Sequence, residues 1–122
     1  MYEVNRTQDL LAALSDADRL RVVRALLKRG QASGSELGAI AGISQSTCAR
    51  HLKELEACGL IFRARRKQPY RLFDPDGTRA LLQAASHLAR ETLGHASELE
   101  EFFRRELDED GSEPDQSAEM PR

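Results

Sequence analysis

The chain has 122 residues and a mass of 13.6 kDa, the size of one domain, which leaves little room for a second core. Hydrophobic residues make up 40% and aromatic residues only 5%, so the sequence supplies a helical core that is thin for a free-standing monomer. No apolar run approaches the roughly 18 residues of a membrane span, and the N-terminus has no signal-peptide pattern. We therefore expect a cytoplasmic protein that oligomerises and has no membrane partner.

The net charge of −2 conceals a division of sign along the chain. Residues 1–72 hold 13 basic and 7 acidic side chains, whereas residues 73–122 hold 5 basic and 13 acidic ones. Seven of the basic residues lie between positions 50 and 71, and such a patch is typical of nucleic-acid binding. The two halves are expected to face different partners.

Apolar spacing and capping residues predict four helices in the first half of the chain, over residues 7–14, 15–30, 33–42 and 44–58. Ser15 followed by Asp18, and Ser33 followed by Glu36, have the spacing of helix N-caps. The third and fourth helices are separated by a turn over 42–44, which is the spacing of a helix-turn-helix.

In the fourth predicted helix, Cys48, Leu52 and Leu55 recur at helical spacing and are expected to face the core, leaving hydrogen-bonding residues outside. From Leu60 the hydrophobic period changes to two, which predicts a β-hairpin over about 60–73.

After a turn at 74–77, an apolar stripe predicts a helix of about thirty residues over 77–107, too apolar to stay uncovered. Residues 9–107 then form one domain, between an N-terminal arm over 1–8 and a disordered acidic tail over 108–122. The expected fold is mostly α with a small β-hairpin.

This order of elements is that of a winged helix-turn-helix, and two stretches resemble the ArsR/SmtB family of bacterial repressors. The second helix of that family is similar to LLAALSDADRLRVVRALL, and its DNA-reading segment is similar to SELGAIAGISQSTCARHLKELEACGLI. The resemblance covers about residues 10–72, and the last helix is similar in position and length only. It implies a long C-terminal dimerisation helix and a homodimeric repressor that binds an inverted-repeat operator. The hairpin departs from the family, because Lys67-Gln68-Pro69 replaces the Gly usual at its tip.

The exposed face of the fourth predicted helix carries side chains that bind bases or phosphates. Gln45 and Arg50 can make two-pronged contacts with base edges, while Lys53 and the hairpin cations suit phosphates. The residues expected to bind double-stranded DNA are Ser44, Gln45, Ser46, Thr47, Arg50, His51, Lys53, Arg63, Arg65, Arg66 and Lys67. Those expected at a homodimer interface are Leu10, Leu11, Leu14, Leu88, Leu99, Phe102 and Phe103.

The resemblance also raises the question of a sensor, since metal-sensing members use thiols near the third helix or carboxylate and histidine ligands on the last. This chain has Ser33 and Ser35 at the first set of positions and Leu82 and Ala84 at the second, so we expect no metal and no cofactor. Two alternatives stay open. One is a zinc-type site from His87, His95 and Glu98, completed by a second subunit, and the other is thiol-redox sensing through Cys48.

No Ser-His-Asp set, phosphate-binding glycine loop or paired carboxylates outside the acidic end is recognisable, so an enzyme is not expected. The favoured interpretation is a sequence-specific DNA-binding transcriptional regulator, a homodimeric repressor with an unknown small-molecule or redox effector. The alternative is a winged-helix adaptor that binds protein.

Overall fold

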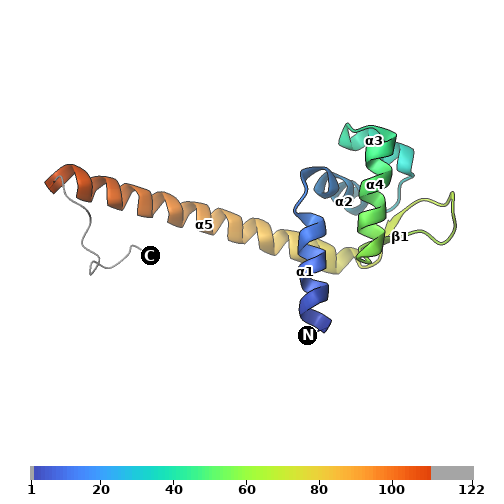
Figure 1. Cartoon of the computed structure of the whole chain (residues 1–122), viewed down its shortest axis with the longest axis horizontal. Helices are drawn as coiled ribbons and strands as arrows, with labels where there is room; N and C mark the ends of the chain where they lie inside the picture. The colour runs from blue at the N-terminus through green and yellow to red at the C-terminus, as the bar shows by residue number, and fades with distance from the viewer. Residues whose placement is uncertain (1, 111–122) are drawn as a thin grey trace. The chain divides into compact units, whose positions relative to one another are not determined.

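The computed structural model describes residues 2–110, with side chains described for 6–106, and the chain divides into two compact units, Met1–Arg79 and Ala80–Arg122. The first unit contains α1 (Tyr2–Leu14), α2 (Ala17–Arg29), α3 (Gly34–Ala41), α4 (Gln45–Ala57), β1 (Ile61–Phe62) and β2 (Arg71–Leu72). Helix α5 (Pro75–Asp110) begins in the first unit and forms the described part of the second. In the first unit, α1–α4 gather together and the β1–β2 loop extends from them (Figure 1). This is a winged helix-turn-helix, as expected.

The core of the first unit lies between α2, α3 and α4, and α3 packs against both of the others. Burial of apolar side chains is the main force that holds these helices together. Cys48, Leu52 and Leu55 are all buried, which confirms the inward stripe predicted from their spacing. The largest fully buried side chains are Val22, Val23, Leu26, Leu37, Cys48 and Leu55.

Local hydrogen bonds fix where the helices begin. Ser33 and Glu36 form the predicted capping box of α3, with each side chain accepting from the other residue's backbone N–H, at 3.1 and 3.0 Å. Ser44 caps α4 by accepting from the N–H of Thr47 at 3.2 Å. The cap of α2 is Asp16 rather than Ser15, since the Asp16 carboxylate accepts two backbone bonds.

Two glycines set the geometry on either side of α4. Gly42 ends α3 in the left-handed region (φ 71°), and Gly59 has φ 84° just after α4. Side chains other than glycine rarely adopt this backbone conformation, so these positions make the tight turns that separate α4 from its neighbours.

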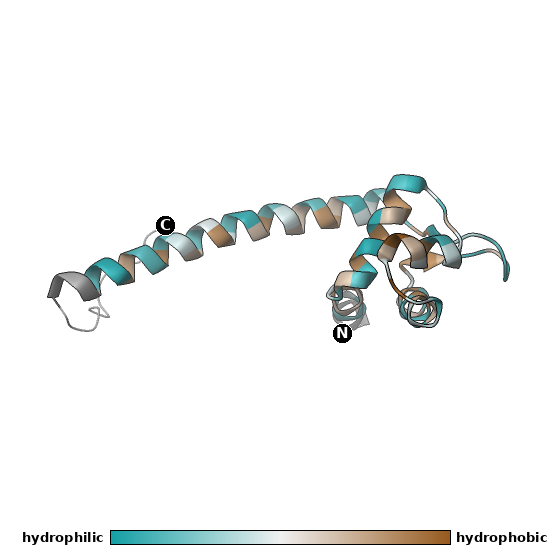
Figure 2. Ribbon diagram, turned by 90° about the horizontal axis from the view of Figure 1, so that it is seen from above, coloured by the Kyte–Doolittle hydropathy of each residue, from teal (hydrophilic) through white to brown (hydrophobic). Residues whose placement is uncertain are grey.

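The wing is the segment from β1 to β2, and it is shorter than the predicted hairpin. Its strands pair antiparallel with Ile61 opposite Leu72 and Phe62 opposite Arg71, and each is two residues long. Figure 2 shows the loop between them in hydrophilic colours. At its tip Lys67 takes φ 84°, the strained conformation for which a glycine is usual.

An additional backbone bridge joins the wing to the α2–α3 connection. Tyr70 and Ala32 exchange two hydrogen bonds, N–H to O=C, at 2.8 and 3.2 Å. The wing is thereby fixed against the body of the unit at its second strand, while its loop stays outside.

Three predicted boundaries are corrected by the structure. The arm expected over 1–8 is wrong from Tyr2 onward, because α1 begins at Tyr2. The turn expected at 74–77 is the start of α5, with Pro75 in the first turn and Asp74 accepting from the N–H of Gly77 at 2.9 Å. Helix α5 continues to Asp110, so the expected tail cannot begin at 108, and residues 111–122 lie outside the described ones.

In the second unit α5 carries apolar side chains that its own unit leaves uncovered. Leu88 is 62% exposed and Leu93 70% exposed, and the rings of Phe102 and Phe103 meet edge to face at 5.4 Å. Leu99, Phe102 and Phe103 are half-buried.

On α1, Leu11 is exposed and Leu10 is half-buried, but Leu14 is only 8% exposed and belongs to the core. Leu14 is among the residues expected at a dimer interface, and within the single protomer it packs mostly in the core, so it offers a second copy less surface than Leu11.

Candidate nucleic-acid interface

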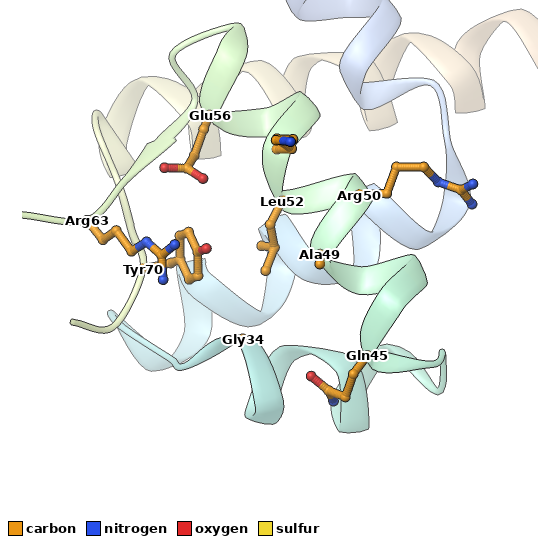
Figure 3. A pocket seen from close by; sticks show the side chains of 9 residues that line it. Gly34, Gln45, Ala49, Arg50, Leu52, Glu56, Arg63 and Tyr70 are labelled. Atoms are coloured by element: carbon orange, nitrogen blue, oxygen red, sulfur yellow. The ribbon is translucent and has the colours of Figure 1, made fainter. Parts of the chain in front are cut away.

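The outer face of α4 presents polar and basic side chains opposite the buried stripe. Gln45, Ser46, Arg50 and Lys53 are exposed, and Thr47 is half-buried. Among the described residues, Arg50 and Lys53 form no ion pair or hydrogen bond, and Figure 3 shows Arg50 extending away from the helix. Both cations are therefore available to phosphates or base edges.

Two polar side chains at the start of α4 already have protein partners. The Ser44 hydroxyl bonds the hydroxyl of Thr47 at 2.9 Å as well as its backbone N–H. The Gln45 amide donates to the carbonyl of Ser35 at 3.3 Å and lies over Gly38, where a Cβ would collide with it. Gln45 therefore has to leave α3 before it can reach a base.

His51 does not share the exposed face, which corrects the expectation that it contacts DNA. Its side chain is buried at 7% exposure and faces α2. Arg19 Nη1 lies 3.3 Å from His51 Nδ1, and the Arg19 Nε–H donates to the carbonyl of Ala13 at 2.6 Å. Because a guanidinium only donates, Nδ1 is assigned as the acceptor and the ring proton belongs on Nε2.

That second ring nitrogen faces the N-terminus of α2. His51 Nε2 lies 3.7 Å from Asp18 Oδ2 and 3.9 Å from Asp16 Oδ1. Within the described part of the chain, these three residues bring a nitrogen and two carboxylate oxygens within 4.8 Å of one another, as a metal site would. The set fits a metal poorly, because a metal on Nε2 would leave the ring proton on Nδ1, facing the Arg19 guanidinium, and the Asp16 carboxylate already accepts the two cap hydrogen bonds. We interpret it as the anchor that ties α4 to α2.

The hydrogen bonds of the α2 cap also lower the pKa of the Asp16 carboxyl. The backbone N–H of Arg19 donating to its carboxylate lowers the pKa of Asp16 below the ordinary value of 3.8, and Asp18 N–H, His51 and the Arg19 charge act in the same direction. Partial burial opposes them.

The wing cations fall into two groups. The guanidinium of Arg63 lies over the ring of Tyr70, 4.5 Å from its centre, and Arg71 donates to the side chain of Gln31 at 2.7 Å. Arg65, Arg66 and Lys67 are exposed in the loop and have no described partner. The loop cations thus have no described protein contact, while Arg63 is held in place by the ring of Tyr70.

Sequence reasoning missed Arg19, Asp16 and Tyr70 as parts of this interface. Extending the register of the wing places Arg63 opposite Tyr70, so a correct strand pairing would have found that contact. The partners of His51 lie 32 and 35 positions earlier in the sequence, and no local pattern connects them.

The candidate sensor residues give no formed site among the described residues. Cys48 is 1% exposed, its thiol points to the carbonyl of Gly34 at 3.7 Å, and burial raises its pKa. His87, His95 and Glu98 are exposed on α5. Cys58 is buried and donates to Leu55 O at 3.3 Å.

Comparison with known proteins places this interface in a family. A helix-turn-helix domain model matches residues 14–61. The transcriptional repressor BigR from Xylella fastidiosa is 31% identical over 71% of this chain and 89% of its own, with a TM-score of 0.59. The cadmium metal-sensor CMTR from Mycobacterium tuberculosis is 33% identical over 62% of this chain and 80% of its own, with a TM-score of 0.52.

The same fold occurs in a homodimeric winged helix-turn-helix DNA-binding domain from Mycobacterium bovis, a possible ArsR-family transcriptional regulator. It is 24% identical over 77% of this chain and 87% of its own, with a TM-score of 0.65. The chain belongs to the ArsR family. Its fold and family are those of DNA-binding transcriptional regulators and not of enzymes.

A comparison with curated protein sequences found no match to this ArsR-family chain. Among the described residues, none of the helices combines the length and the apolar character needed to cross a membrane.

The charge of Asp16 predicts a specific loss of stability in acid. Its lowered pKa means that it stabilises the fold above pH 3.8 and that this contribution is lost as the pH falls through the folded-state pKa. Asp16→Asn keeps a capping oxygen but removes the charge, so it should melt below the parent at pH 7, and the difference should narrow as the pH falls below 3.8. Thermal denaturation followed by circular dichroism from pH 7 to 2.5 measures this.

Asp9→Asn is the control, because Asp9 is exposed and forms no hydrogen bond within the described residues. A gap between Asp16→Asn and the parent that stays constant with pH would contradict the role of the charge.

Proposed function

We propose that this ArsR-family protein is a homodimeric repressor that binds an inverted-repeat operator, with α4 in the major groove. The observation that carries the proposal is the two-sided character of α4. One side is held in the core by Cys48, Leu52 and Leu55, and on the other Arg50 and Lys53 have no partner among the described residues. A rigidly held helix with free cations on its outer face suits groove binding.

Within this proposal, some residues of α4 and the wing contact bases and others contact phosphates. Arg50, in the second turn, reads a base edge, and Gln45 joins it once it leaves Ser35. Lys53 and the loop residues Arg65 and Arg66 grip phosphates, which fixes the register without reading sequence.

Dimerisation follows from the apolar face of α5 in the second unit. Exposed leucines such as Leu88 and Leu93 are costly to leave in water, and the related domain from Mycobacterium bovis is a homodimer. A symmetric pair would present two copies of α4 about one turn of DNA apart, roughly 34 Å, and this spacing is the reason for an inverted repeat.

The proposal is tested directly by measuring binding of the full chain to DNA from upstream of its own gene. Selection of binding sites from a pool of random sequences then identifies the preferred DNA sequence. A gel shift that requires an inverted repeat, together with a dimer by size exclusion, is the expected result. Equal binding to all DNA sequences, or none, would contradict it.

Arg50 provides the sharpest test of base reading. Arg50→Ala should lose about 1–3 kcal/mol of discrimination between operator and random DNA, because a two-pronged contact with one base is gone. Fluorescence anisotropy on both DNAs measures the ratio of dissociation constants. Arg24→Ala is the matched control, since Arg24 is an exposed arginine on α2 away from this face. If operator and random DNA lose affinity equally in Arg50→Ala, Arg50 only contacts phosphate.

The wing is tested by salt dependence. Removing both Arg65 and Arg66 with alanine should reduce the slope of log affinity against log salt by about 1.8, since each phosphate contact contributes about 0.9. The loss should be the same for operator and random DNA. The double variant Arg24→Ala/Lys28→Ala removes the same charge from α2 and should leave the slope nearly unchanged. An unaltered slope in the wing variant would remove the loop from the interface.

The dimer is tested at Leu88, which is exposed and therefore dispensable for folding of the protomer. Leu88→Glu should weaken self-association at least about ten-fold, because a carboxylate would be buried between two apolar helices. Sedimentation equilibrium gives the dissociation constant. Arg90→Glu, two residues further along α5 and exposed on another face, is the control. A parent chain that is monomeric at micromolar concentration would exclude the dimer.

A further inference from the structure

A pocket of about 550 Å³ lies in the first unit between α4, the start of α3 and the wing (Figure 3). This volume is within the range of roughly 300–1,000 Å³ found for small-molecule sites. Its floor is apolar, because Leu52 and Tyr70 are buried there and Gly34 contributes no side chain. Neither a base-reading role nor a phosphate contact accounts for an apolar floor beneath a cationic rim.

The rim carries three cations and one carboxylate. Arg50 and Lys53 come from α4, Arg63 comes from the wing, and Glu56 lies near the end of α4. Figure 3 shows the Arg50 side chain directed away from Tyr70, so Lys53 and Arg63 are the lining cations left for a ligand. Arg63 is already held in place by the ring of Tyr70, so it meets a ligand without first being ordered. Figure 3 shows Glu56 directed toward Arg63 and Tyr70, on the side of the pocket away from Gln45. The excess of positive charge selects an anion.

We propose that this pocket binds a free organic anion, a phosphate or carboxylate group attached to a small apolar body. The charged group meets Lys53 and Arg63 at the rim, and the apolar body covers Leu52 and Tyr70. Because Lys53 also serves the proposed DNA contact, ligand and DNA exclude each other. Only this competition rests on the proposed function, since binding of the anion itself does not require DNA.

Two kinds of ligand could place an organic phosphate group in this pocket, namely a free organic phosphate and the phosphodiester backbone of DNA. The first test therefore uses the full chain without DNA and three probes in calorimetric titrations: phenyl phosphate, inorganic phosphate and phenol. Phenyl phosphate should bind once per protomer and roughly ten-fold or more tighter than inorganic phosphate, because the ring covers apolar surface. Equal affinity for phenyl phosphate and inorganic phosphate, or no binding, would overturn the proposal.

Gly34 allows the pocket to be filled without touching its charges. A Cβ at Gly34 would lie 3.6 Å from Leu52 Cδ1 and 3.9 Å from Tyr70 Cε2, which are ordinary contacts. Gly34→Leu should abolish binding of phenyl phosphate, whereas Gly34→Ala, the matched control, should retain it. Circular dichroism and the melting temperature establish that both variants fold. Unchanged affinity in a folded Gly34→Leu variant would place the ligand elsewhere and overturn the proposal.

A substitution at Glu56 is expected to tighten ligand binding, whereas damage to the fold would only weaken it. Glu56→Gln removes a negative charge from the rim and should tighten the binding of phenyl phosphate roughly five-fold, the effect of one unit charge about 4 Å away in water. Weaker binding in this variant would contradict an anion in the pocket.

Competition with DNA separates the two sources and the two proposals. Phenyl phosphate should displace labelled operator with the constant measured in its direct titration. If Gly34→Leu weakens DNA binding and the parent chain without DNA does not bind phenyl phosphate, the pocket contacts the DNA backbone. The proposal of a free ligand is then overturned. If the chain binds phenyl phosphate but no DNA, the pocket stands and the proposed repressor function fails.

Discussion

The attachment of α4 to α2 and α3 is the constraint on which the rest of the molecule depends. Cys48, Leu52 and Leu55 bury one side of the helix, and His51 adds a polar contact with Arg19 and Asp16 at its edge. Apolar burial holds the helix but is not directional, whereas the ring of His51 between a guanidinium and the α2 cap fixes its rotation. The outward direction of Arg50 and Lys53 follows from that rotation.

The described cations of the first unit divide into those that are paired within the protein and those that are not. Arg19, Arg21, Arg29, Arg63 and Arg71 each have a described partner within the protein. Arg50, Lys53 and the wing loop do not. Exposed cations that form no ion pair are available to an incoming anion, and they lose nothing in breaking an internal pair.

The helices and their order were predictable because their signals are local. Ser33, Ser44 and Gly42 act through neighbours within four positions, and the structure has them as predicted. His51 was misplaced although it lies three residues after Cys48 and borders the same stripe, because a histidine is polar and its partners lie on another helix. The wing boundaries and the Arg63–Tyr70 contact required the strand register, which two-residue strands do not reveal in a sequence.

The buried thiol and the open pocket differ in how much the protein would have to move in order to respond to a signal. Cys48 is enclosed beside Gly34, and its raised pKa keeps it as the unreactive thiol, so an oxidant needs the α3–α4 packing to open first. The pocket is already open beside the same Gly34 and shares Lys53 with the outer face of α4. A ligand there needs no conformational change to occupy charges that DNA would use, because the two compete for the same atoms. Direct competition between a ligand and DNA would thus need less structural rearrangement of the protein than oxidation of Cys48.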